Sequence, residues 1–276
     1  MKICINLMGG FGNMLFQFMF GYSMARKNKA FLTFICNEKK RCDATKYNFL
    51  NKYNINKSIN NEYIILKEMN HYYDEYKLNQ NHNYYIIGFF QSYKYSFEYF
   101  EEIKEIIFNN LSEKINKIIP IYELIKDKKT TIGIHIRKTD YVELYDIHYI
   151  IRNDEWYDIA IKQLLKKINL NKDNIRLILF SDDINYLKKM EIFKQYDSVI
   201  AENYNLDIEE TFLLMSYSDN FIISNSTYSL MAYYFRKNKN AKIVIPNKWF
   251  GIKGPKYKIE DIIEITENVI INYVNT

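Results

Sequence analysis

The alternation of short apolar strands with helices between residues 131 and 246 constrains the fold more than any other feature of this sequence. Strands that alternate with helices form a parallel sheet that is covered on both faces. The sequence therefore predicts an α/β unit in this part of the chain. The expected strands are 131–137, 175–180, 198–201, 220–224 and 242–246, and the expected helices are 154–168, 184–190, 208–217 and 228–236.

A second α/β unit is predicted in the first 127 residues, because 276 residues are enough for two cores. Strands are expected at MKICINL, 31–36 and 84–90, and helices at 14–27, 96–109 and 112–127, with Pro120 marking a kink or a break. Residues 37–83 are rich in Asn, Lys and Tyr and are assigned no order. The predicted domains are 1–127 and 128–246, followed by a segment 247–276 that returns to the first domain.

The charge of the chain argues against nucleic acid as a partner. A net charge of +5 arises from 38 basic and 33 acidic residues, without the clustered basic stripe of a nucleic-acid binder. A mildly basic surface instead suits a phosphorylated ligand or peripheral contact with the cytoplasmic face of a membrane. The sequence shows no apolar run of 18 residues and no secretory signal, so neither a transmembrane helix nor export is expected.

Cysteines and histidines do not have the spacing of a metal site. Three cysteines, Cys4, Cys36 and Cys42, are an odd and sparse set, which suits a reducing, cytoplasmic compartment. Four histidines are scattered along the chain. No bound metal is expected.

Polar clusters follow the strands, and the first is GGFGN at residues 9–13. Its glycines allow a ligand to approach the backbone, and the helix start that follows offers free N–H groups to an anion. Gly10 and Asn13 are the candidate binding residues. The alternative is an ordinary tight turn between strand and helix. The pattern is not GxGxxG, which disfavours a dinucleotide-dependent enzyme.

The second cluster is His135-Ile136-Arg137-Lys138-Thr139-Asp140. Two adjacent cations after a strand indicate an anionic ligand, since ligands of open α/β sheets bind outside the carboxyl ends of the strands. The guanidinium of Arg137 can hold a phosphate with two hydrogen bonds, which Lys138 cannot. The alternative role for Arg137 is an ion pair with Asp140.

Two more clusters follow later strands. Asp182, in Ser181-Asp182-Asp183, can accept hydroxyl groups of a ribose or a sugar, while Asp183 can instead cap the next helix. The Asn225-Ser226-Thr227 segment precedes a helix and can hold a phosphate, although Ser226 or Thr227 can equally be a simple N-cap.

Taken in order, these segments resemble the bacterial-type α-1,2-fucosyltransferases, glycosyltransferase family 11. INLMGGFGNMLFQFMFGYSMA is similar to their GGLGNQMFQYA motif, and IGIHIRKTDYV is similar to their HxRRxDY motif. LFSDDINYLKK and ETFLLMSYSDNFIISNSTYSLMAYYF resemble their FSDD and LMSxCxxxIIANSSFSWWAA segments. The four stretches extend from residue 5 to about residue 236.

The resemblance implies a GT-B fold, in which two Rossmann-like domains face one another across a cleft. It implies a GDP-β-L-fucose donor bound by domain 128–246, an oligosaccharide acceptor on the side of domain 1–127, inversion at the anomeric carbon and no required metal or other cofactor. Arg137 matches the arginine that contacts the donor pyrophosphate, and His135 matches the histidine near the nucleotide. Asn225, Ser226 and Thr227 fall in the segment that lines the phosphate site.

The chain departs from the family pattern at several positions. Lys138 stands where the family has its second arginine, and Thr139 stands where it has a glycine. Met14 replaces a glutamine, and Leu230-Met231 replaces a pair of tryptophans. Two alternatives therefore stay open: the same fold using another GDP-linked deoxyhexose, and a glycan- or nucleotide-binding protein without activity. The candidate general bases are Asp140, Glu143 and Asp146, with Asp140 favoured. Oligomeric state and acceptor stay open.

Overall fold

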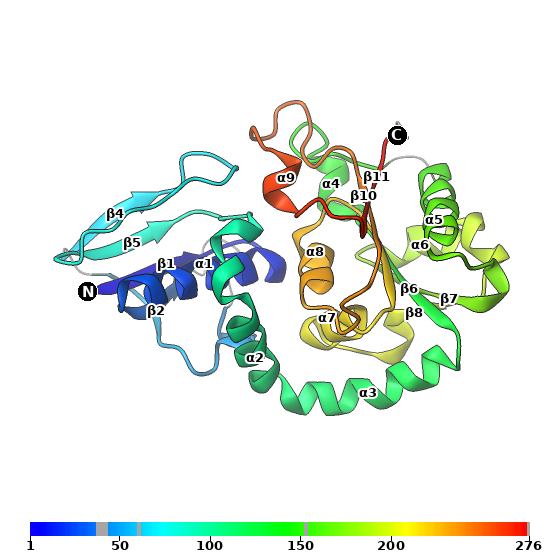
Figure 1. Ribbon diagram of the computed structural model, residues 1–276, viewed down its shortest axis with the longest axis horizontal. Helices are drawn as coiled ribbons and strands as arrows, with labels where there is room; N and C mark the ends of the chain where they lie inside the picture. The colour runs from blue at the N-terminus through cyan, green and yellow to red at the C-terminus, as the bar shows by residue number, and fades with distance from the viewer. Residues whose placement is uncertain (37–43, 60–61, 152–153, 275–276) are drawn as a thin grey trace. The chain divides into compact units, whose positions relative to one another are not determined.

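The computed structural model describes residues 1–36, 44–59, 62–151 and 154–274 (Figure 1). The chain divides into two compact units. The first unit consists of Met1–Ser112 and Pro255–Glu264, and the second consists of Glu113–Gly254 and Ile265–Thr276. The second unit therefore begins with the helix that follows Ser112, whereas the sequence places the boundary after residue 127.

The first unit is built on a parallel sheet of five strands in the order β3-β2-β1-β5-β4. The chain starts in the middle of the sheet, adds β2 and β3 on one side, and then adds β4 and β5 on the other. The strands are β1 (Lys2–Leu7), β2 (Phe31–Cys36), β3 (Ile55–Asn56), β4 (Tyr63–Lys67) and β5 (Asn83–Ile87).

An apolar helix accounts for much of the core of this unit. Helix α1 (Phe11–Asn28) follows β1 and buries 13 of its 18 residues. The ring of Phe20 stacks on that of Phe90 with 3.7 Å between centroids. The remaining helices are α2 (Phe100–Asn110), α9 (Ile259–Ile262) and the short 3-10 turns η2 (Ala44–Lys46), η3 (Asn48–Leu50), η4 (Tyr93–Tyr95) and η5 (Phe97–Tyr99).

The second unit contains a parallel sheet of six strands in the order β11-β10-β9-β6-β7-β8. From β6 the chain moves outward to β7 and β8, returns to place β9 on the other side of β6, and continues to β10 and β11. This is a doubly wound arrangement. The strands are β6 (Thr130–Ile136), β7 (Ile175–Ser181), β8 (Ser198–Ile200), β9 (Asn220–Ile223), β10 (Ile243–Pro246) and β11 (Val269–Asn272).

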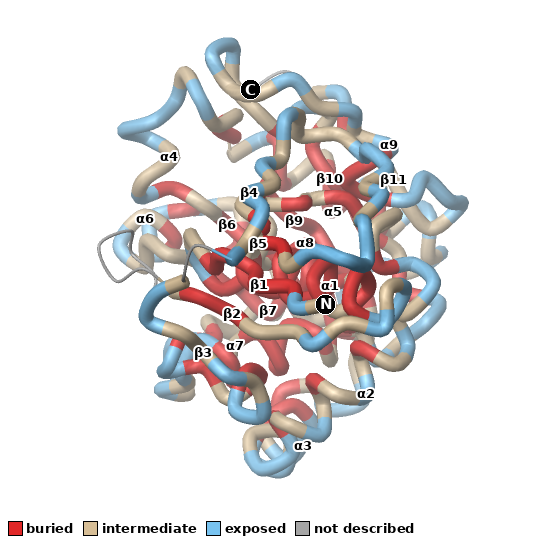
Figure 2. Tube along the Cα trace, turned by 90° about the vertical axis from the view of Figure 1, so that its left-hand side faces the viewer, coloured by how far each residue is buried: buried red, intermediate tan, exposed pale blue. Residues whose placement is uncertain are grey.

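The core of the second unit lies between this sheet and its helices. Every residue of β9 and β10 is buried, as expected for strands covered on both faces (Figure 2). Trp156, Ile161 and Leu164 of α5 pack against the sheet. The helices are α3 (Ser112–Lys126), α4 (Thr139–Glu143), α5 (Glu155–Ile168), α6 (Ile184–Lys189), α7 (Ile208–Ser216) and α8 (Thr227–Tyr234), with 3-10 turns η6 (Lys172–Asn174), η7 (Glu191–Gln195) and η8 (Ala201–Tyr204).

The predicted α/β class and the strand–helix alternation are confirmed, and the differences are local. Helix α3 continues through Pro120, so the expected break is wrong. The segment after β6, expected as a loop, contains the short helix α4. The unassigned stretch 37–83 contributes β3 and β4, two short strands on either side of the first sheet.

No helix in the described part of the chain has the length and apolar character needed to cross a membrane. Cys4 is free and buried, and Cys36 is disulfide-bonded.

Candidate functional site

The topology of the second unit singles out the carboxyl ends of β6 and β9. These two strands are neighbours, with His135 opposite Ile223, and the chain order reverses between them. In doubly wound sheets, ligands bind in the crevice at such a reversal. Residues 135–140 and 224–227 therefore meet at the position where a ligand is expected.

His135 and Ser224 connect the two strand ends. The backbone N–H of Ser224 donates to the carbonyl of His135 at 3.2 Å, and His135 Nδ1 lies 3.0 Å from Ser224 Oγ. Burial, together with the nearby Arg137 guanidinium, lowers the pKa of His135. The ring is therefore neutral at physiological pH. Ser224, which precedes the Asn225-Ser226-Thr227 segment, was not among the predicted site residues.

Arg137 lies just beyond β6 and remains partly exposed. Its Nη2 is 2.8 Å from Asp140 Oδ1 and its Nε is 3.2 Å from Asp182 Oδ2, while its guanidinium carbon lies 5.4 Å from the ring centroid of Tyr141. The ion pair with Asp140, the alternative to a ligand contact, is thus present. The side chain is still 29% exposed, so its remaining N–H groups are available to an anion.

Asp182 organises the chain after β6. Its Oδ1 accepts the backbone N–H of Lys138 at 2.9 Å, and its Oδ2 accepts both the backbone N–H of Thr139, at 3.2 Å, and the Thr139 hydroxyl. With the Arg137 contact, both carboxylate oxygens are occupied. Asp182 therefore fixes the segment that carries Arg137. The neighbouring Asp183 caps α6 by accepting from the N–H of Tyr186 at 2.9 Å, which confirms the alternative role considered for it.

Lys138 points away from its neighbouring cation. The side chain is buried, and its Nζ donates to the carbonyl of Ile151 at 2.6 Å and lies 4.2 Å from the ring centroid of Tyr186. Burial lowers the pKa of this ammonium group. The structure thus does not bring the Lys138 and Arg137 cations together on one ligand.

The Asn225-Ser226-Thr227 segment leads into α8. Ser226 is the N-cap residue, but its side chain makes no capping hydrogen bond. Asn225 Nδ2 donates to the carbonyl of Trp249 at 2.6 Å, and the Asn225 carbonyl accepts from the Tyr141 hydroxyl at 3.0 Å. Within the described residues Asn225 Oδ1 is buried without a hydrogen-bond partner. A buried acceptor of this kind calls for a donor from a ligand or water.

The segment between β6 and α5 is held against the chain after β10. The His148 ring stacks on Tyr141 with 4.3 Å between centroids, and the N–H of Gly251 donates to the carbonyl of Ile147 at 2.8 Å. A Cβ on Gly251 would lie 2.6 Å from the carbonyl oxygen of Asp146, so this approach requires glycine. The Asp146 carboxylate pairs with Lys253 Nζ at 2.6 Å, which occupies one candidate base.

Gly10 and Asn13 belong to the first unit, at the start of α1. Gly9 has a φ of 77°, and its own Cβ would lie 2.5 Å from Asn13 Nδ2, so Gly9 is the residue that the turn requires. Gly10 is the N-cap of α1, and a Cβ there would meet nothing within 4 Å. Asn13 Oδ1 accepts from Gln91 Nε2 at 2.9 Å. Open space above Gly10 fits a ligand that approaches the backbone.

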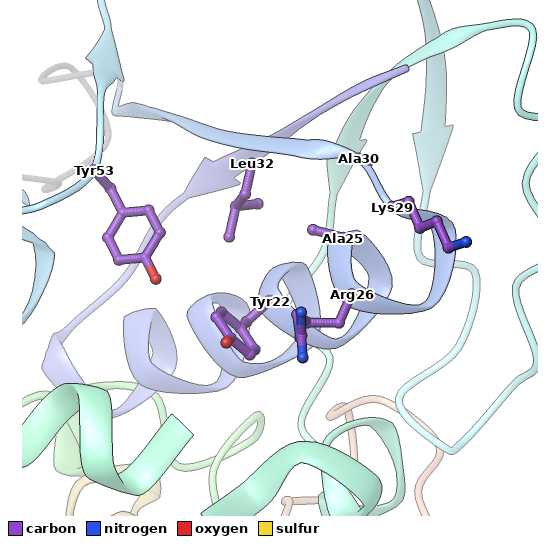
Figure 3. A pocket seen from close by; sticks show the side chains of 7 residues that line it. All are labelled: Tyr22, Ala25, Arg26, Lys29, Ala30, Leu32 and Tyr53. Carbon is purple, nitrogen blue, oxygen red and sulfur yellow. The ribbon is translucent and has the colours of Figure 1, made fainter. Parts of the chain in front are cut away.

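A pocket of the first unit lies at the other end of its sheet. Seven residues line a space of about 290 Å³, in which the rings of Tyr22 and Tyr53 and the side chain of Leu32 surround the opening (Figure 3). The pocket borders the last turns of α1 and the start of β2, at the amino edge of the strands. It is therefore distinct from the Gly9-Gly10 turn at the carboxyl edge. No three His, Cys, Asp or Glu residues in the described ranges form a group able to hold a metal ion.

Solved structures show which class of fold this is. The chain is similar to NodZ alpha-1,6-fucosyltransferase co-crystallized with GDP, with a TM-score of 0.54 and 14% identity over 85% of this chain and 92% of that one. It is also similar to a variant of Arabidopsis thaliana FUT1 in complex with GDP, with a TM-score of 0.52 and 12% identity over 88% of this chain and 69% of that one. The α/β fold with two parallel sheets is therefore of the GT-B type.

Comparison of the sequence identifies the family of the chain. Residues 5–262 match the profile of Glycosyl transferase family 11, and the chain belongs to this family. It is 31% identical over 171 residues to an Alpha-1,2-colitosyltransferase of Escherichia coli, a match that covers 59% of this chain and 55% of that protein. The resemblance found from the four sequence motifs is thus confirmed.

Proposed function

We propose that the chain is an inverting, metal-independent glycosyltransferase that moves L-fucose from GDP-β-L-fucose to a hydroxyl of a glycan, the 2-hydroxyl of a terminal galactose. The observation that carries this proposal is the meeting of a partly exposed Arg137 with the start of α8 at the reversal point of the second sheet. Family membership and the GDP bound in the structurally similar fucosyltransferases support the choice of donor.

The proposed reaction requires positive charge where the diphosphate of the donor binds. As the glycosidic bond breaks, the leaving diphosphate gains negative charge, which must be stabilised by fixed donors when no metal does so. The guanidinium of Arg137 and the N–H groups at the start of α8 supply these donors. Asp182 holds the backbone next to Arg137, so the donors are fixed before the ligand arrives. In this scheme Asp182 positions Arg137 rather than binding the sugar.

The other donor-side residues have narrower roles. His135, neutral and bonded to Ser224, offers its remaining ring nitrogen and shape rather than charge. Asn225 Oδ1 accepts a hydrogen bond from the nucleotide, and Ser226 and Thr227 carry N–H groups of the helix start. Lys138 supports the loop through Ile151 and contributes to phosphate binding only as a nearby charge.

Asp140 is the proposed general base, but its contact with Arg137 gives it a second role. A base must reach the attacking hydroxyl, while a carboxylate that pairs with Arg137 can equally hold the guanidinium in place. Glu143 is an exposed alternative at the end of α4. In the first unit, Gly10 and Asn13 are proposed to contact the sugar nucleotide through the open turn.

A second candidate keeps the site and changes the sugar. The relative from Escherichia coli transfers colitose by its name, and colitose is a fucose without the 3-hydroxyl. The residues described above recognise phosphate and nucleotide, and they do not discriminate between these sugars. A GDP-linked dideoxyhexose is therefore the alternative donor.

The test is release of GDP from GDP-fucose and from GDP-colitose, with lactose or N-acetyllactosamine as acceptor, in EDTA. We expect acceptor-dependent release from one of these donors and none from UDP- or ADP-sugars. Product linkage, determined by NMR, then tests transfer to the 2-hydroxyl. Binding of GDP without turnover of either donor would overturn the proposed reaction, and absence of GDP binding would overturn the assigned site.

A further inference from the structure

A carboxylate of the first unit, Glu68, has no part in the chemistry described above. It follows the edge strand β4 and lies beside Gly88, the first residue after β5. The N–H of Glu68 donates to the carbonyl of Ile87 at 2.8 Å, which extends the pairing of the two strands. A Cβ on Gly88 would lie 2.4 Å from Glu68 Cβ, so the segments that follow β4 and β5 approach closely at the carboxyl edge of the sheet.

Both oxygens of this carboxylate bind the turn after β5. Glu68 Oε2 accepts the backbone N–H of Phe89 at 2.6 Å, and Oε1 accepts the backbone N–H of Phe90 at 3.0 Å. Phe90 has a φ of 51°, a backbone conformation that side chains other than glycine adopt rarely. A residue held in this way requires surrounding contacts that fix it, and such positions cluster at ligand sites.

The turn is connected through Gln91 to Asn13, one of the candidate binding residues. Gln91, next after Phe90, donates from Nε2 to Asn13 Oδ1 at 2.9 Å. Gln91 Oε1 is buried and has no hydrogen-bond partner among the described residues, so it is a ready acceptor for a hydroxyl of a ligand. The contacts thus run from Glu68 through Phe89 and Phe90 to Gln91, and from there to Asn13.

We propose that Glu68 is a positioning residue, which fixes the turn 88–91 so that Gln91, held by Asn13, presents its amide oxygen to the glycan acceptor. The proposal rests on the proposed glycosyl transfer for its substrate. Its structural part, that an ionised Glu68 holds this turn, stands on the hydrogen bonds alone. An amide oxygen without net charge suits a neutral, hydroxyl-rich ligand, which is what a terminal galactose offers.

The surroundings of Glu68 make this support dependent on pH. Burial raises the pKa of Glu68 to about 7, although the two backbone hydrogen bonds lower it. The neighbouring titratable groups are the hydroxyls of Tyr76 and Tyr95, whose pKa values are raised, and His71, whose ring lies 5.9 Å from that of Phe89. No cation compensates Glu68 among the described residues. A proton on either oxygen weakens one of the two backbone hydrogen bonds.

The first experiment is steady-state kinetics of the full-length chain from pH 6 to 8.5, for the wild type, Glu68→Gln and the exposed control Glu75→Gln. We expect Glu68→Gln to lower kcat/KM for the acceptor about tenfold to a hundredfold at pH 8, as a small displacement of binding groups does. In the wild type, kcat/KM for the acceptor should fall as the pH decreases through about 7, the acid limb of the pH profile. This acid limb should be absent in Glu68→Gln and present in Glu75→Gln. Binding of GDP should change much less than kcat/KM for the acceptor, because most of its proposed contacts lie in the second unit.

A purely structural role predicts a different result. In that case the melting temperature of Glu68→Gln falls, GDP binding weakens with it, and the acid limb of the remaining activity persists. We expect instead a melting temperature close to that of the wild type, because the substitution removes a buried charge as well as one acceptor. An unchanged acceptor kcat/KM, or an acid limb that remains in Glu68→Gln, overturns the proposal.

The second experiment needs neither activity nor a variant. Hydrogen exchange of the Phe89 and Phe90 amides in the wild type should show protection that falls as the pH decreases through about 7, relative to the Ile86 amide within β5. Protection independent of pH overturns the role of Glu68 even if Glu68→Gln does not fold. Conversely, pH-dependent protection in a chain that turns over no GDP-sugar leaves the inferred role of Glu68 in the turn intact and refutes only the proposed reaction.

Discussion

Asp182, at the carboxyl end of β7, accepts the backbone N–H of Lys138, which lies just beyond β6, at 2.9 Å. This hydrogen bond joins the ends of two neighbouring strands. It sets the direction of the chain from β6 into α4, so that the Arg137 side chain emerges on the exposed side and the Lys138 side chain turns inward.

Replacement of Arg137 tests the centre of the site. Arg137→Ala should lower kcat by about a hundredfold to a thousandfold, the usual effect of removing one donor to a developing negative charge. Arg137→Lys should recover only part of this loss, because an ammonium cannot form two parallel hydrogen bonds. The measurement is GDP release, with Lys162→Ala on the exposed face of α5 as control. A turnover near that of the wild type in Arg137→Ala would refute the assigned role.

Asp182 and the adjacent Asp183 form a matched pair of tests. Asp182→Asn should destabilise the protein by about 1–3 kcal/mol, since an amide cannot accept all the hydrogen bonds that the carboxylate accepts. It should also reduce turnover through the displaced Arg137. Asp183→Ala should cost about 1 kcal/mol as the loss of a helix cap and leave turnover unchanged. Denaturant unfolding and GDP release measure the two effects, and equal losses of turnover would contradict the distinction.

Substitutions of Gly9 and Gly10, in the turn before α1, distinguish an effect on folding from an effect on ligand binding. Gly9→Ala should destabilise the protein by about 1–2 kcal/mol, because its φ is positive and its Cβ would contact Asn13. Gly10→Ala should leave the stability unchanged, since a Cβ there meets open space. If a ligand approaches this backbone, Gly10→Ala should still lower kcat/KM. Thermal melting and kinetics decide this, and full activity in Gly10→Ala would remove Gly10 from the site.

His135 should make the protein less stable at mildly acidic pH. Its pKa in the folded protein lies below the ordinary value of 6.5, so below pH 6.5 the unfolded chain binds a proton that the folded ring does not. The free energy of unfolding should therefore fall as the pH decreases, by up to about 1.4 kcal/mol per pH unit for this group. His135→Gln should show a smaller slope in urea unfolding between pH 6.5 and 5. Since His71 and His148 also have lowered pKa values, a smaller slope should remain.

The strands that carry the site could be predicted because each is a short apolar run that ends in polar residues. The runs before Arg137 and Asn225 indicated both the parallel sheet and the edge at which ligands bind. Their pairing as direct neighbours depends on strand order, which local sequence does not determine. The reversal point between β6 and β9 therefore became visible only with the fold.

The side-chain directions at the site could not be predicted, because adjacent cations are equivalent in a sequence. Contacts made in the fold distinguish the partly exposed Arg137 from the buried Lys138, whose N–H binds Asp182, 44 residues away, and whose ammonium group binds the carbonyl of Ile151. Glu68 was missed for a related reason. It lies in the stretch 37–83 without a periodic pattern, and its partners Phe89 and Phe90 are more than 20 residues away.

The path of the chain between the two units has a consequence for how they can be separated. Residues 255–264 belong to the first unit, and the chain then returns to the second, where β11 pairs with β10. A chain ended after Gly254 would lose this last strand and leave β10 as a bare edge that invites association with other chains. A single cut between the units would likewise release neither of them whole. Exchange of either unit between related proteins therefore requires new junctions at all three crossings of the chain, after residues 112, 254 and 264.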